Sequence, residues 1–175
     1  MSPVVLLDAE LSGAHRVWSN TSSPGNLTIT STTRSFTNNT GRRLTPMVLQ
    51  YIGQGQVGLS GQNAGYATVE SGCGTTSSIT RTIRWALAGS NDNGTRYIIF
   101  KGDIPYFTQT DVSSSSETIM LAPPVTVVEP GGGFYVSVAS RWVSEQWNKK
   151  AVGYDSWDYC DFPYTRIQVL GFPAP

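Results

Sequence analysis

The chain has 175 residues with 12 basic and 12 acidic side chains, so its formal net charge is zero. This length suits one domain, and 39% hydrophobic residues are too many for a disordered chain. Charged residues make up only 14% of the sequence, and Ser and Thr supply much of the remaining polar surface. Such a neutral surface excludes the electrostatic attraction on which general nucleic-acid binding depends.

The first residues show no targeting signal. Met1 to Asp8 contains only a short apolar run, and no Lys or Arg precedes Arg16. A secretory signal needs a basic start followed by about 7–15 apolar residues, and a membrane span needs roughly 18. We therefore expect a product made in the cytoplasm without a membrane partner. Cys73 and Cys160 are too few for a disulfide framework, so separate reduced thiols are the simpler expectation, although pairing in the fold stays open.

Short runs of β-branched and aromatic residues, separated by Gly, Asn, Pro and Ser, recur along the chain. The runs that predict strands are, in chain order, 27–30, 44–51, 66–70, 78–85, 97–101, 118–121, 125–128, 134–139 and 166–170. Residues 91–94, Asn-Asp-Asn-Gly, predict a hairpin turn because Asn-Gly tolerates positive φ. Residues 129–133, Glu-Pro-Gly-Gly-Gly, predict a second sharp reversal. Only residues 140–150 favour a helical turn.

The pattern as a whole predicts an all-β fold of about nine to eleven short strands, an antiparallel β-sandwich or jelly roll. No boundary divides the chain into two folded units. Residues 1–25 end in turn-forming residues and are predicted to be an N-terminal arm or attachment segment. Residues 26–175 are predicted to form the β-sandwich domain.

Few of the residues that catalysis requires are present. His15 is the single histidine, and no nucleophile motif accompanies it, so we expect neither a Ser-His-Asp nor a Cys-His mechanism. A zinc site is not expected either, because the chain has no Cys-x-x-Cys pair and no second histidine. The sequence therefore predicts a protein that is not an enzyme and that binds no cofactor or metal.

Three carboxylates leave two other possibilities open. Asp155, Asp158 and Asp161 are spaced three residues apart. Two carboxylates that face one sugar can support glycoside hydrolysis, and three can bind a cation such as Ca²⁺ through oxygen ligands. A solvated surface loop is the simpler interpretation of this spacing.

Aromatic residues concentrate in the last part of the sequence, where residues 134–175 hold more than half of them. Trp and Tyr supply a large contact area at low conformational cost and keep a polar group, which suits stacking on sugar rings. The predicted ligand-binding residues are Trp147, Tyr154, Asp155, Trp157 and Asp158. The alternative is burial in the core or a subunit interface, which we expect for Phe134 and Trp142.

Two stretches resemble one protein family. Residues 36–43, Phe-Thr-Asn-Asn-Thr-Gly-Arg-Arg, lead into the predicted strand 44–51. They are similar to the Tyr-x-Asn-x-Thr-Gly-Lys/Arg-Pro opening of the tip domains of tailed-bacteriophage fibres. Residues 127–138, Val-Val-Glu-Pro-Gly-Gly-Gly-Phe-Tyr-Val-Ser-Val, look like the Val-Pro-x-Gly-x-x-Tyr-x-Val turn and strand late in the same domains. The resemblance covers residues 28–148.

The resemblance implies a β-sandwich that trimerises and binds a cell-surface glycan or protein. We therefore expect a non-enzymatic virion protein made in the host cytoplasm: a homotrimeric tail-fibre or receptor-binding component that contacts other virion proteins and the host surface. The family has no fixed set of binding residues, so no site residue follows from it. A capsid decoration protein that stabilises the head lattice is the first alternative, and a cellular carbohydrate-binding lectin is the second.

Overall fold

The computed structural model describes residues 2–19, 25–58, 63–92, 95–100, 111–113, 115–146 and 158–175. These residues form strands and no helix, and so none of them belongs to a helix that could cross a membrane. The strands are β1 (Val4–Ser12), β2 (His15–Ser19), β3 (Gly25–Ser35), β4 (Leu44–Ile52), β5 (Gln56–Gly58), β6 (Asn63–Gly74), β7 (Thr82–Asp92), β8 (Thr95–Phe100), β9 (Asp111–Ser113), β10 (Glu117–Leu121), β11 (Tyr135–Gln146), β12 (Asp158–Phe162) and β13 (Thr165–Pro173).

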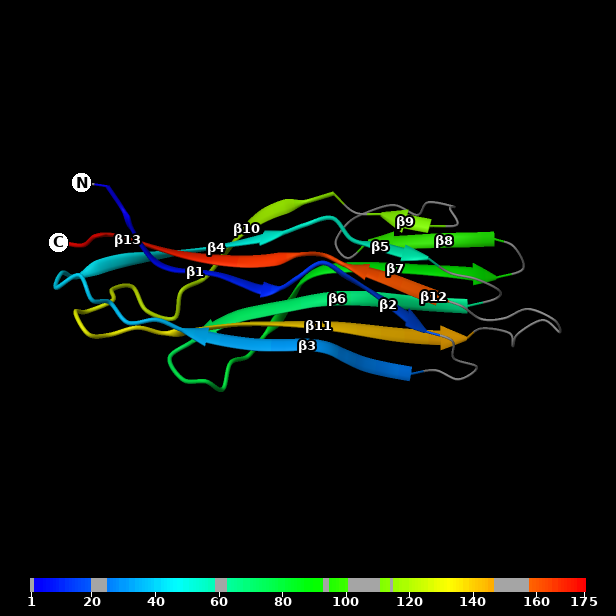
Figure 1. The fold of residues 1–175 in the computed structure, drawn as a ribbon, viewed down its shortest axis with the longest axis horizontal. Helices are drawn as coiled ribbons and strands as arrows, with labels where there is room; N and C mark the ends of the chain where they lie inside the picture. The colour runs from blue at the N-terminus through cyan, green and yellow to red at the C-terminus, as the bar shows by residue number, and fades with distance from the viewer. Residues whose placement is uncertain are drawn as a thin grey trace.

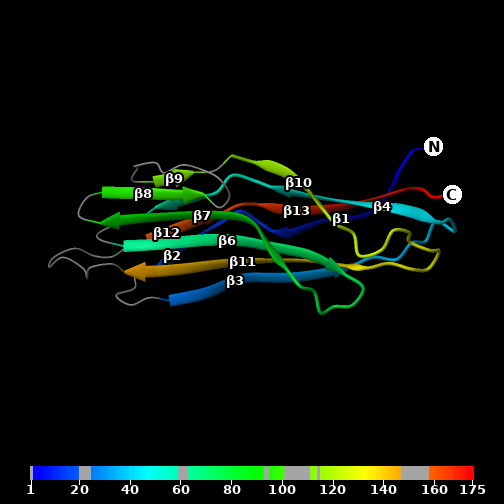
Figure 2. The same ribbon diagram turned by 180° about the vertical axis from the view of Figure 1, so that it is seen from behind.

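The strands form an elongated sandwich of two layers (Figure 1). The first layer consists of two four-stranded sheets, with the orders β1-β13-β4-β10 and β2-β12-β5-β9. The two orders correspond because β1 continues into β2, β4 into β5, β9 into β10 and β12 into β13, each after a short break. The first layer is therefore one sheet of four long strands that bend at the same level. The second layer is the five-stranded sheet β3-β11-β6-β7-β8, seen from its own side in Figure 2.

The order in which the chain visits the two layers makes this sandwich a jelly roll. The chain passes from β1/β2 in the first layer to β3 in the second, and then to β4/β5 in the first. It continues through β6–β8 in the second layer, β9/β10 in the first, β11 in the second and β12/β13 in the first. As a result β13 lies between β1 and β4, and β11 lies between β3 and β6, as in a double Greek key. The predicted all-β fold is confirmed.

The hydrophobic core lies between the layers. Side chains alternate between the core and the surface along β4 and β13, as the period of a strand requires. Val48, Val136 and Ile167 are among the fully buried residues that the layers contribute. A polar contact also joins the layers, because the buried Ser71 hydroxyl donates to Gln50 Oε1 at 2.6 Å.

The connections from β3 to β4 and from β10 to β11 lie at the end of the sandwich that carries both termini (Figure 1), and Asn38 in the first connection joins them. Its side chain is 1% exposed, and its Nδ2 donates to the backbone oxygens of Arg42, Val128 and Glu129 at 2.7, 3.1 and 3.3 Å. Its Oδ1 accepts from the hydroxyl of Thr40 at 2.7 Å. One amide therefore satisfies groups in both of the stretches that carry the family resemblance.

Backbone bonds and glycines complete this junction. The N–H of Asn38 donates to the oxygen of Gly132 at 2.7 Å, and the N–H of Gly131 donates to the oxygen of Asn38 at 2.8 Å. Gly131 has a φ of +79°, which confirms the predicted reversal at residues 129–133. A Cβ at Gly133 would lie 1.8 Å from the backbone oxygen of Phe36, so no larger residue fits there without moving the turn.

Two predicted elements are wrong. Residues 140–146 continue β11 instead of forming a helical turn, because they pair with β3 on one side and β6 on the other. Residues 147–150 lie outside the described residues. Residues 125–128 form no strand and make only a single bridge between Val128 and Leu44, since Pro123 and Pro124 interrupt the chain just before them.

Most of the other expectations agree with the structure. β7 and β8 pair in antiparallel fashion up to Asp92 and Thr95, which confirms the predicted hairpin. The segment 1–25 differs from the arm that the sequence predicts, because its strands β1 and β2 pair with β13 and β12 in the first layer of the sandwich. Phe134 is buried in the core as expected. Cys73 and Cys160 are both free thiols, and burial raises the pKa of Cys73 to about 11 and that of Cys160 further.

The junction at Asn38 generates a stability prediction. Replacing Asn38 by Ala should lower the free energy of unfolding by about 3 kcal/mol, because the backbone oxygens of Arg42 and Val128 each lose one donor and the Thr40 hydroxyl loses its 2.7 Å acceptor. Asn39, its exposed neighbour, gives the matched control, and Asn39→Ala should change stability by less than about 0.5 kcal/mol. Urea denaturation measures both. Equal losses in the two variants would show that the amide of Asn38 does not hold the turns together.

Candidate functional site

Most of the predicted ligand-binding residues lie outside the described residues. These are Trp147, Tyr154, Asp155 and Trp157. Asp158 begins β12 and pairs with Ser19 of β2, but its side chain is also outside the described part. β11 ends and β12 begins at the end of the sandwich away from the termini (Figure 1). Because the side chains of residues 147–158 lie outside the described part, the predicted aromatic patch stays a prediction. Where side chains are described, no group of three or more His, Cys, Asp or Glu is placed to hold a metal ion.

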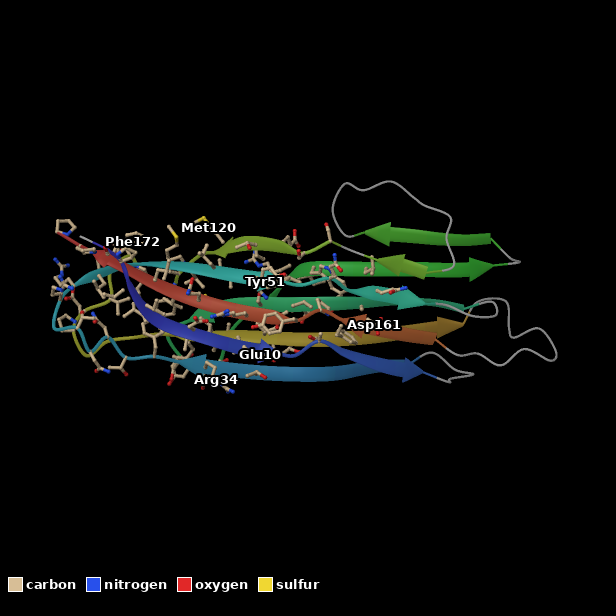
Figure 3. The ribbon with its side chains drawn as sticks, turned by 45° about the horizontal axis from the view of Figure 1, so that its top comes forward. Glu10, Arg34, Tyr51, Met120, Asp161 and Phe172 are labelled. Carbon is tan, nitrogen blue, oxygen red and sulfur yellow. The ribbon has the colours of Figure 1, made fainter. Side chains whose placement is uncertain are left out.

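A pocket of about 400 Å³ opens on the outer face of the first layer. Its lining residues come from β4, β10 and β13 and from the residue that precedes β13: Leu49, Tyr51, Thr118, Tyr164, Arg166 and Gln168. The volume lies within the range of about 300–1,000 Å³ that small-molecule sites occupy. Tyr51 lies near the middle of the long axis of the molecule (Figure 3).

Strand alternation brings these side chains to the surface together. In β4, Gln50 and Ile52 are fully buried, so the residues between and before them, Tyr51 and Leu49, point outward. Tyr51 pairs with Arg166 on one side and with Thr118 on the other. Leu49 pairs in the same way with Gln168. The pocket therefore consists of two neighbouring rows of outward-facing residues across three strands.

The bend in the first layer adds Tyr164. This residue lies in the break between β12 and β13, and its backbone oxygen accepts from the N–H of Gly53 at 2.7 Å in the break after β4. The two bends lie close together, since a Cβ on Gly53 would be in ordinary contact with the Cβ of Tyr164 at 3.5 Å. The rings of Tyr51 and Tyr164 have centroids 6.1 Å apart and planes tilted by 58°. The pair offers a flat apolar surface on each ring.

The positive charge of Arg166 is paired with the carboxylate of Asp8, which lies in the same sheet. Its Nε and Nη2 donate to the two carboxylate oxygens of Asp8 on β1, in a two-point ion pair. Hydrogen bonding to Arg166 lowers the pKa of Asp8, a hydrogen bond to Gln168 adds to this, and Asp8 in turn raises the pKa of Arg166. Glu10 pairs with Arg166 in the register of β1 and β13 and is exposed. Arg166 is the only charged residue among those that line the pocket.

An apolar strip lies beside the pocket on the same face. We define it as Val5, Met47, Met120, Leu170 and Phe172. Val5 is 59% exposed and Met120 is 65% exposed, whereas the other three are half-buried. Val5, Leu170 and Met47 form one cross-strand row. Met120 and Phe172 lie on the termini side of Tyr51 (Figure 3).

The sequence did not identify this pocket. Tyr51 and Arg166 occur in two predicted strands, and the alternation of those strands was the available signal that both face outward. Tyr164 belongs to the aromatic-rich last part of the chain, but nothing local links it to Tyr51. The pocket depends on pairing between β4 and β13, which are far apart in the sequence.

Comparisons with known proteins do not assign the chain to a family. No protein-family model matches the chain, and no curated protein sequence is significantly similar to it. A CocE/NonD family hydrolase from Staphylococcus aureus matches with a TM-score of 0.25 at 8% identity, over 98% of this chain and 36% of that protein. The Gt strain of infectious bursal disease virus matches with a TM-score of 0.24 at 14% identity, over 99% of this chain and 43% of the other. The VP2 subviral particle of that virus gives 0.24 at 12% identity, over 99% and 43%.

The chain thus spans less than half the length of each of these structures. At such TM-scores and identities they carry no inference about its function. The function has to be argued from the pocket and the surface around it.

The ion pair of the site predicts how Asp8 titrates. Because Arg166 stabilises the carboxylate, the pKa of Asp8 should lie below its ordinary value of 3.8. The contribution of the pair to stability is then present above about pH 4 and is lost as the pH falls through the lowered pKa. Carboxyl ¹³C NMR titration should show a higher Asp8 pKa in Arg166→Gln than in the parent. A parent value at or above the ordinary one would contradict the ion pair.

Proposed function

We propose that the chain is a non-enzymatic structural component of a virion that attaches to the host surface, as a tail-fibre or receptor-binding protein. The observation that carries the proposal is the pocket with two tyrosine rings on the outer face of a jelly roll. Jelly rolls serve as viral capsid domains and as lectin domains, so the fold is compatible with both parts of this function.

The pocket has the composition of a recognition site. Two aromatic rings and Leu49 supply apolar contact, while Thr118, Gln168 and Arg166 supply donors and acceptors at fixed positions on strands. Side chains on strands are held more rigidly than side chains on loops, so the ligand would meet a preformed surface. A site of this kind suits binding to a repeated unit of a cell surface.

The sequence resemblance to fibre tip domains adds independent support. The two stretches that carry it, residues 36–43 and 127–138, contact each other through Asn38. The ion pair of Arg43 Nε with Glu129 Oε1 at 3.0 Å joins them again. The stretches therefore act as one structural unit in this chain, which is what a family motif with two separated parts requires.

The apolar strip favours a second candidate function, capsid decoration. An exposed apolar strip can form a contact between copies, and a second copy of this neutral chain would meet no like-charge repulsion there. By strand spacing the strip covers roughly 200–300 Å², well below the ~800 Å² per partner of a standard interface. Such an area suits one of several small contacts between copies, as in the proposed homotrimer or on a capsid lattice.

Immunogold electron microscopy distinguishes the candidates. An antibody against the purified protein should label the tails of particles of the virus whose genome encodes the chain. Label over the heads would favour decoration instead, and particles without label would contradict a virion role.

Competition for host cells tests the pocket directly. Purified parent protein should block adsorption of particles, and Tyr51→Ala combined with Tyr164→Ala should weaken the block at least about ten-fold because both ring surfaces are lost. Tyr135 lies on β11 in the other layer, so Tyr135→Ala is the matched control and should block as the parent does. Equal blocking by all three proteins would contradict attachment through this pocket.

A further inference from the structure

We propose that the pocket lined by Tyr51, Tyr164 and Arg166 binds a neutral sugar unit and rejects sugars that carry a carboxylate. This inference rests on the proposed attachment function, since it names the ligand class of the same site. It follows from three features of the described residues: the pair of rings, the polar groups around them and the matched charge of Arg166.

The rings set the shape of the ligand. Both rings line the pocket, and their centroids are 6.1 Å apart with planes tilted by 58°. A pyranose ring presents an apolar C–H face that packs on such a surface, as apolar groups pack on aromatic rings in general. The pocket of about 400 Å³ has room for about one or two sugar rings.

The polar side chains that line the pocket can form hydrogen bonds with sugar hydroxyls. Thr118 and Gln168 each offer both a donor and an acceptor, and a sugar hydroxyl also does both. The guanidinium of Arg166 has five N–H donors, and the ion pair with Asp8 uses two of them. The pocket therefore surrounds its apolar surface with neutral hydrogen-bonding groups and with donors that remain on Arg166.

The charge distribution disfavours an acidic ligand. Asp8 takes the two-point interaction at the Nε and Nη2 donors of Arg166, so a ligand carboxylate could accept only from the donors that remain at the Nη1 end. There it would meet the negative charges of Asp8 and of Glu10, which pairs with Arg166 in the sheet register. Two negative charges thus stand beside one positive charge at this edge of the pocket.

Isothermal titration with two matched sets of oligosaccharides tests the inference. The neutral probes are oligomers of glucose, mannose, galactose and N-acetylglucosamine, and the acidic probes are oligomers of glucuronic and galacturonic acid. The parent should bind at least one neutral probe and no acidic one. Tyr51→Ala and Tyr164→Ala should each weaken that binding about ten-fold or more, and Tyr135→Ala should leave it unchanged.

Asp8→Asn tests the role of the charge. The substitution keeps the size of the side chain but leaves Arg166 without its carboxylate partner. The variant should gain measurable binding of the acidic probes, weakened by salt, while its affinity for the neutral probe stays within about two-fold. A thermal melt confirms that the variant is folded. Failure of a folded Asp8→Asn variant to gain acidic-sugar binding would overturn the role assigned to Asp8.

The outcomes separate this inference from the proposed function. Preference of the parent for an acidic probe, or adsorption to host cells without binding of any sugar probe, would overturn the inference and leave attachment standing. Absence of both sugar binding and adsorption would overturn the proposed attachment function as well.

Discussion

The hydrogen bonds of the Asn38 side chain connect two turns whose residues are 90 positions apart in the sequence, and the rest of the sandwich depends on this connection. The turn at residues 36–43 carries the chain from β3 in the second layer to β4 in the first. Residues 122–134 carry it back from β10 in the first layer to β11 in the second. Both crossovers occur at the same end, and one buried amide satisfies backbone groups in each. The relative position of the two layers is therefore fixed by a polar contact as well as by the apolar core between them.

That constraint also determines the candidate site. β4 begins directly after the first crossover, where Leu44 forms a bridge with Val128, and its alternation then places Tyr51 on the outer face. A shift of one residue in the pairing of β4 with β13 would place Tyr51 and Arg166 on opposite faces of the sheet, because side chains alternate with a period of two. The pocket therefore requires the jelly-roll register. Its ligand preference in turn depends on Asp8, which reaches Arg166 only because β1 pairs with β13.

The sequence predicts the parts of this structure that local patterns specify. Alternation in residues 44–51 and 166–170 and the glycines at 131–133 predict strands and a turn that the structure contains. Residues 140–146 have no local signal that overrides their helical tendency, because two partner strands decide their conformation. The buried Gln50 and the Tyr51–Tyr164 pair depend on long-range pairing and could not be predicted from local patterns. The aromatic patch of residues 147–158 was predicted from composition alone and stays a prediction.

Amide chemical-shift mapping with neutral oligosaccharides released from the host surface tests the central claim most directly, since it locates the ligand without assuming a site. The account predicts that the largest shifts occur at the pocket residues of β4, β10 and β13 and at Tyr164, and that Tyr51→Ala abolishes them. Shifts confined to residues 147–158 would assign recognition to the predicted aromatic patch instead. That result would contradict the conclusion that the outer face of the first layer is the recognition surface of this protein.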